Sequence, residues 1–347
     1  MFRDKMKLAL KDLVEQAGSQ GTVTIIRELL EEKKVRPEDF SIREIYEAVT
    51  SDMFPIITGE LINAKIIDAY KAAPTIGDQL VTTVPSKMEV ETIAGFDTPD
   101  TPEVVPEGAP YNYATVGEKY VTIRNYKYGR LIAVTEEAIY FDRTGQLLMR
   151  AQQIGEKAAY YKEKIIVEKV IDVSSNAYAV SGTPGVLYRT AASGNHKINS
   201  RAATPFGEAG LEEAFKLQHN MTDENGDFVF ISPVGMTCLV PQDLLVEALQ
   251  MVQSTLVPEN VDNAVNIYKN AFKVLTSPFI TAQSATTWYL GDFKQDMVWT
   301  EVWPLETMAM KPGSEDEFKK DIKAQFKVRF LGGCGAIDAK HVYKFTA

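Results

Sequence analysis

The sequence predicts an α+β fold, in which helices and strands occupy different stretches of the chain. Residues 146–171 carry apolar side chains at the three- and four-residue spacing of one long amphipathic helix. Strand-like runs occur at 79–93 and 119–133, and several more follow in the last third of the chain. With 347 residues, the protein has room for a sizeable core in two lobes.

The first predicted region is a helical arm at residues 1–53. Three short helices are expected, at Phe2–Ala17, at Thr22–Lys34, and from Pro37 to Val49, with Gly18–Gly21 interrupting the first two. Helices of this length are marginal in water, so the arm needs a surface to lie on. That surface is either the body of the same chain or a neighbouring molecule.

A helix at 54–72 leads into a long excursion. Its connecting segment, about 88–118, contains Pro99, Pro102, Pro106 and Pro110 and few residues that could form a core of their own. Proline fixes the backbone and removes a hydrogen-bond donor, so this segment is expected to be extended. It nevertheless carries apolar groups, which makes it a candidate contact region. The candidate contact residues are Val104, Val105, Tyr111 and Tyr113.

The central stretch contains the long helix at 146–171. Thr135 is placed to cap a short helix at 138–141 before it. Residues 174–207 are rich in Ser, Gly, Ala and Asn, which predicts a surface loop. The apolar face of the long helix is expected to be Leu147, Leu148, Ala151, Ile154, Ala158, Tyr161, Ile165 and Ile166.

The last third contains an ordered series of predicted elements. A helix at 211–220 is followed by the polar turn DENGD, the strand FVFIS and a second strand that ends at Val240. Pro241 is expected to open a further helix, and WYLGDF and MVWTEVW follow as strands. A closing hairpin is predicted in the segment FKKDIKAQFKVRFLGGCGAIDAKHVYKF, with a bulge at Gly332–Gly335.

No motif supplies a catalytic, cofactor-binding or metal-binding chemistry. Dinucleotide, P-loop, zinc-protease and nucleophile-elbow patterns are absent from the sequence. The turn DENGD fails as a calcium loop, because Met221 and Ser232 would stand where acids are needed. Cys238 and Cys334 are expected to be buried free thiols, and His196, His219 and His341 share no ligand spacing. We therefore expect no catalytic residue, no cofactor and no metal.

Charge and hydropathy restrict the partners. The net charge of −10, with basic residues interleaved among acids, argues against specific binding of nucleic acid. No window is apolar enough for a membrane span, and the charged first residues do not resemble a signal peptide. These observations indicate a protein that is made in the cytosol and has no membrane partner.

The order of elements from Leu211 to Phe345 resembles the major capsid (head) proteins of tailed bacteriophages, in particular the Mu-type branch. That branch has a helix, an NEDG-like turn, a P…L.VP..L…A run, a WYL.D strand and a FKVR…G…D….YK ending in this order. The resemblance implies the phage major-capsid fold. Its parts would be the arm at 1–53, a peripheral domain at 54–205 with an extended loop at 88–118 and a spine helix at 146–171, an axial domain at 206–316, and returning strands of the peripheral domain at 317–347.

The resemblance further implies a structural protein, not an enzyme. It would self-assemble into hexamers and pentamers of an icosahedral head in the bacterial cytoplasm and would reside in the virion. Its other partners would be a portal, a scaffold or prohead protease, and packaged double-stranded DNA that is contacted weakly. The alternatives are an encapsulin-like nanocompartment shell, another virion component such as a tail protein, and a soluble enzyme with an unrecognised site. A cargo enzyme encoded beside the gene would favour the first, and a compact monomer with a ligand pocket would favour the last.

Overall fold

The computed structural model describes residues 54–96, 104–108, 110–111, 113, 118–135, 137, 146–192, 197–223, 225–232, 235–256, 265–309 and 321–347. The predicted arm at 1–53 and the short helix predicted at 138–141 lie outside these residues. The chain forms two compact units, each described by itself below. The first comprises Met1–Pro74, Lys127–Tyr161 and Trp303–Leu331, and the second comprises Thr75–Tyr126, Lys162–Val302 and Gly332–Ala347.

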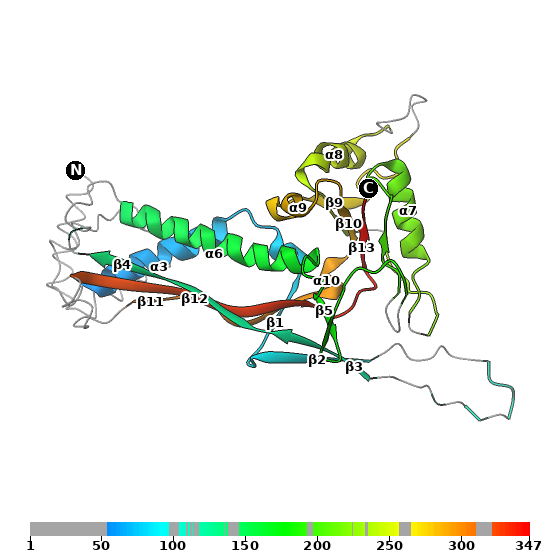
Figure 1. Ribbon diagram of the computed structural model, residues 1–347, viewed down its shortest axis with the longest axis horizontal. Coiled ribbons are helices and arrows are strands. Elements are labelled where there is room, and N and C mark those ends of the chain that lie inside the picture. Colours follow the sequence, from blue (N-terminus) through cyan, green and yellow to red (C-terminus); the bar gives the residue numbers. More distant parts are fainter. Residues whose placement is uncertain are drawn as a thin grey trace. The chain divides into compact units, whose positions relative to one another are not determined.

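The first unit is built on two helices that lie side by side, α3 (Phe54–Ala72) and the first part of α6 (Gln146–Val170) (Figure 1). α3 buries one stripe of side chains at helical spacing, including Leu61, Ile62 and Ile66. The helices approach closely at Gly155, where a Cβ atom would stand 2.4 Å from the carbonyl oxygen of Ile66. Only glycine permits this contact, so Gly155 sets the packing of the pair.

The long helix predicted at 146–171 is confirmed, but its buried face is rotated from the predicted one. Tyr161 is 47% exposed and Ile154 is only partly buried. The buried stripe instead follows small residues and one carboxylate in the middle of the helix, because close helix packing favours small side chains there. It comprises Leu148, Ala151, Gly155, Ala159, Glu163, Ile166 and Val170.

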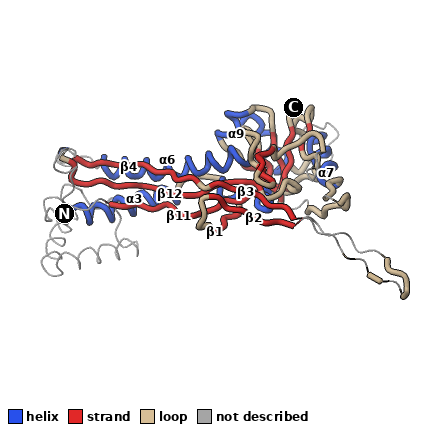
Figure 2. The backbone as a smooth tube through the Cα atoms, turned by 60° about the horizontal axis from the view of Figure 1, so that its bottom comes forward, coloured by secondary structure: helices blue, strands red, loops and turns tan. Residues whose placement is uncertain are grey.

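Three long strands run through the chain's two units, β4 (Tyr126–Thr135), β11 (Met297–Ala309) and β12 (Ile322–Ala336). With β1 (Thr82–Pro85) they form a sheet of order β1-β11-β12-β4, and Figure 2 shows the long strands next to one another. β1 is parallel to β11, with Thr82 opposite Val298. In β12 every second side chain is buried from Phe326 to Phe330, as expected for a strand with one face against a core.

The prediction of a closing hairpin at the end of the sequence is wrong. β12 pairs within the sheet just described, whereas β13 (Val342–Phe345) belongs to a different, five-stranded sheet. The glycines predicted to form a bulge lie within β12 and serve close packing. A Cβ on Gly332 would stand 2.6 Å from the Trp299 ring, and one on Gly333 would stand 2.4 Å from the carbonyl oxygen of Arg124.

The five-stranded sheet of the second unit has the order β7-β13-β10-β8-β9. β13 is parallel to β7 (Ser200–Arg201) and antiparallel to β10 (Trp288–Gly291). β8 (Met236–Leu239) is antiparallel to β10 and parallel to β9 (Phe272–Leu275). The associated helices are α7 (Glu208–His219), the 3₁₀ turn Gln242–Leu244 with α8 (Leu245–Gln253), α9 (Pro278–Gln283) and α10 (Phe293–Asp296).

The core of this sheet is aromatic. Trp288 stacks on Phe345 with ring centroids 4.3 Å apart, and its indole nitrogen donates to the carbonyl oxygen of Thr204 at 3.1 Å. Phe206 packs edge-on against the same indole. These contacts hold β10, β13 and the segment after β7 together.

A second sheet of this unit, β2-β3-β5-β6, carries the excursion predicted before residue 118. β2 (Val90–Phe96) and β3 (Glu118–Arg124) are antiparallel from Val90 opposite Arg124 to Phe96 opposite Glu118. β5 (Tyr178–Val180) and β6 (Thr183–Gly185) extend the sheet beyond β3. The strand predicted at 79–93 is therefore divided into the short helix α4 (Gly77–Leu80), β1 and β2.

Candidate interaction surfaces

The described residues bear on the sequence expectations for metal ligands, membrane spans and cysteines. Among the described residues no three His, Cys, Asp or Glu side chains gather as metal ligands. None of the described helices is both long enough and apolar enough to cross a membrane. Cys238 and Cys334 are free and buried, as predicted. Burial raises the pKa of the Cys334 thiol to about 12 and also raises the pKa of Cys238, which keeps both thiols protonated and unreactive.

Among the residues that the structure describes, His341 pairs with a carboxylate, and the contacts of this pair are structural. The fully buried Asp296 accepts hydrogen bonds from the ring Nδ1 of His341 at 2.7 Å and from the His341 backbone N–H at 2.8 Å. Burial raises the pKa of Asp296. For His341, burial lowers the pKa, but the hydrogen bond and charge of Asp296 outweigh this, and the pKa lies above its usual value. The pair connects α10 to the turn before β13.

A buried polar cluster fixes the base of the β2–β3 hairpin. The Asn125 amide donates to the carbonyl oxygen of Met88 at 2.8 Å and to the hydroxyl of Ser86 at 3.3 Å. Its oxygen accepts from the Thr300 hydroxyl at 2.5 Å. Ser86 in turn donates to a carboxylate oxygen of Glu91, the second residue of β2, at 2.5 Å. The hairpin therefore leaves the second unit from a hydrogen-bonded base.

The four candidate contact residues lie beyond the paired part of this hairpin. Val104 is 96% exposed, Tyr111 is 84% exposed and Tyr113 is fully exposed, while Val105 is partly buried. Among the described residues, Val104, Tyr111 and Tyr113 are therefore apolar groups that stand almost wholly in solvent. Only parts of the predicted loop at 88–118 are among the described residues, so the position of the loop is not described further.

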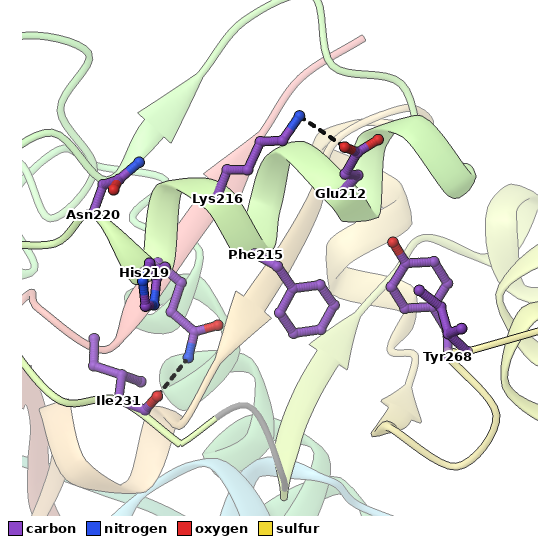
Figure 3. Close-up of a pocket in the computed structure, with 9 residues that line it drawn as sticks. Glu212, Phe215, Lys216, His219, Asn220, Ile231 and Tyr268 are labelled. Atoms are coloured by element: carbon purple, nitrogen blue, oxygen red, sulfur yellow. Dashed lines mark hydrogen bonds and ion pairs between the residues drawn. The ribbon is translucent and has the colours of Figure 1, made fainter.

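A hollow of about 510 Å³ lies on the outer face of α7 (Figure 3). Phe215 of α7 and Tyr268 form one wall, with their rings stacked at 5.8 Å between centroids. Ile231 and His219 lie at the other end (Figure 3). The Gln218 amide donates to the Ile231 carbonyl oxygen at 3.4 Å, which ties the segment after α7 to the helix.

The same segment exposes two phenylalanines. Phe228 is 65% exposed and Phe230 is fully exposed, and both line a second hollow that shares His219, Asn220 and Ile231 with the first. The prediction of a strand at FVFIS is wrong. Only an isolated bridge between Thr222 and Phe228 forms, and the residues after it are irregular. The nearby signals Asn225-Gly226 and Pro233, which favour turns, indicated that this run is short.

Comparison with known proteins places these features in context. A family model described as phage capsid protein matches residues 119–345. No curated protein matches the chain in sequence. The capsid of an empty GTA particle is 12% identical over 77% of this chain and 88% of its own, with a TM-score of 0.51. The capsid of the cyanophage P-SCSP1u (13% identity, 79% and 88%, TM-score 0.50) and a structure of the Microbacterium phage Oxtober96 (12% identity, 78% and 90%, TM-score 0.50) are similar to the same degree. These likenesses show the fold.

Proposed function

The chain belongs to the phage capsid protein family, and from this membership we propose that it is the major head subunit of a tailed phage or prophage. It is a structural protein that forms an icosahedral shell. The family match over residues 119–345, together with a capsid fold that extends over most of the chain, carries this conclusion.

We place the protein in the Mu-type branch of that family. The order of elements on which the resemblance depends is present from α7 to β13, including the turn around Asn225-Gly226, the helix after Pro241 and the buried strand Trp288–Gly291. The proposed division is a peripheral domain at 54–205, an axial domain at 206–316 and returning strands at 317–347. Because β13 pairs with β10, the last returning strand would join the sheet of the axial domain.

Copies of the chain are the main partner in this proposal. Hexamers and pentamers require head-to-tail contacts that close into rings. Val104, Val105, Tyr111 and Tyr113 supply apolar surface for such contacts, because their own chain leaves three of them almost wholly exposed. Each copy would extend its β2–β3 hairpin onto a neighbour. No catalytic residue is needed for this mechanism, since the energy comes from burial of apolar surface.

The other proposed partners follow from the role of a head. A portal and a scaffold or prohead protease would act during assembly in the host cytoplasm. Packaged DNA would be contacted weakly and without sequence preference, because a net charge of −10 disfavours strong phosphate binding.

Expression of the chain, with negative-stain electron microscopy and light scattering, tests the proposal. We expect closed shells or hexamer and pentamer rings. A chain that stays monomeric both alone and with the scaffold protein encoded beside it would contradict the proposed function.

A further inference from the structure

Phe230 is an exposed aromatic residue whose side chain is not buried by the described residues. Its side chain is fully exposed, and Phe228, two residues earlier, is 65% exposed. A large aromatic side chain stabilises a protein mainly by leaving water, so two of them on one short segment indicate a surface that is covered by something else. The segment is held in place by the Gln218–Ile231 hydrogen bond and by the backbone bond from Val229 to Met221, at 2.9 Å.

A hollow of suitable chemistry lies beside this segment on the same molecule. Phe215, Tyr268 and Ile231 give it apolar walls (Figure 3). Ile267 also lines it, with a side chain that is 76% exposed. Its volume of about 510 Å³ is ample for one aromatic side chain. Phe230 does not line this hollow, although its neighbour Ile231 does. The described residues therefore place a fully exposed aromatic side chain on the segment beside an apolar hollow.

The charges around these features exclude a nucleic acid as the occupant. Glu212 and Glu213 stand on α7, and Lys216 is paired with both, at 2.8 and 3.2 Å. Asp223 and Asp227 lie in the turn that precedes Phe228. Phosphate groups would be repelled by these carboxylates, and the lysine of α7 is already paired with them. An apolar side chain flanked by few charges would not be repelled.

We propose that this surface is a contact between two copies of the chain, in which Phe230 of one copy enters the hollow between α7 and Tyr268 of another. A surface that carries both an exposed aromatic group and a hollow allows two copies to meet about a two-fold axis, with Phe230 of each copy in the hollow of the other. The inference rests on the proposed capsid function, and it assigns a second contact that is separate from the β2–β3 hairpin.

Crosslinking tests the contact directly while Phe230 is kept. Ser232→Cys places a thiol two residues after Phe230, and Ile267→Cys places one at the hollow. Both native cysteines are buried and do not react. Assembled protein carrying both substitutions, treated with a short bis-maleimide, is expected to give covalent dimers and larger species on a denaturing gel. Each single variant is the control. Monomers alone from the double variant would overturn the proposal.

Substitution of Phe230 gives the second test. Phe230→Asp is expected to lower the yield of particles roughly tenfold or more, because a charge replaces buried apolar area at every copy of the contact. Phe230→Leu should retain particles, and Asn225→Asp, which adds the same charge to the same segment outside both hollows, should also retain them. Equal yields from Phe230→Asp and wild type, or equal losses from Phe230→Asp and Asn225→Asp, would contradict the docking. A wild-type chain that forms no particles, either alone or with a scaffold protein, would instead contradict the capsid function, and the same crosslinking of the unassembled double variant would still report on the contact.

Discussion

The side-chain oxygen of Asn125 accepts a hydrogen bond of 2.5 Å from the hydroxyl of Thr300, a residue 175 positions later in the chain. Both side chains are buried. The same Asn125 amide donates to the carbonyl oxygen of Met88. One side chain thus joins the start of β2, the end of β3 and the middle of β11, and it fixes the point from which the hairpin departs.

Asn125→Ala is expected to destabilise the protein by about 1–3 kcal/mol, because it leaves the Thr300 hydroxyl and the Met88 carbonyl without this partner. Chemical denaturation gives the free energy of unfolding, and hydrogen exchange should show faster opening of β2 and β3. The control is Glu89→Gln, which removes an exposed ion pair with Arg124 and should cost less than about 1 kcal/mol. Equal costs for the two variants would contradict the role of Asn125.

Val104→Asp with Val105→Asp is expected to abolish shells and leave the monomer folded. Burial of each valine against a neighbour contributes up to about 1.5–3 kcal/mol per copy, and a carboxylate reverses this gain. Electron microscopy reports the particles, and circular dichroism reports the fold. Glu107→Ala, which changes a charge on the same segment without removing apolar surface, should assemble normally. Normal particles from the double aspartate variant would refute the contact.

Gly332→Ala is expected to cost about 1–3 kcal/mol, since the added Cβ would stand 2.6 Å from the Trp299 ring and 2.7 Å from the Thr300 carbonyl oxygen. The measurement is the shift in the denaturation midpoint. Gly182→Ala is the comparison, because that site has open space around it. Its only cost is the strain of an alanine at a left-handed φ of 76°, which should destabilise the protein by roughly 1 kcal/mol. A smaller cost at Gly332 than at Gly182 would contradict the packing described for β12.

Stability is expected to fall as the pH rises above about 6.5. The folded state raises the pKa of His341 above 6.5, so its pairing with Asp296 stabilises fully below that pH and is lost as the pH rises through the folded pKa. Burial raises the pKa of Asp296 from its usual 3.8, so the loss of stability from its ionisation begins at lower pH, above about 3.8. Unfolding free energies from pH 6 to 9 should decline more steeply for wild type than for His341→Gln. Parallel curves would show that the pair does not titrate in this range.

Periodicity was sufficient for the long helix α6 and for the helix at 54–72, because both repeat a helical pattern over many residues. It was insufficient for the face of α6, where Gly155 and Ala159 are buried precisely through their small size and so contribute little apolar signal. It also failed for β13. A strand pattern indicates that a segment is extended, but it does not identify the partner strand. VYKF was therefore predicted to pair with the preceding strand of a closing hairpin, whereas it pairs with β10.

The sequence pattern could indicate some of the exposed apolar residues but not others. Val104, Tyr111 and Tyr113 could be selected from the sequence, because prolines separate them from any local core. Phe228 and Phe230 could not, because alternating apolar residues are typical of a half-buried strand, and only the folded chain shows that neither has cover.

The place of β13 between β7 and β10 has a consequence for synthesis on the ribosome. The buried Asn199, just before β7, donates to the carbonyl oxygen of Val342, 143 residues later. At ordinary translation rates this separation corresponds to roughly 7 to 30 s during which the inner position of the sheet is vacant. Over that interval the nascent chain lacks the strand that completes the core beneath α7, so this sheet can form in full only after the last residues have been synthesised.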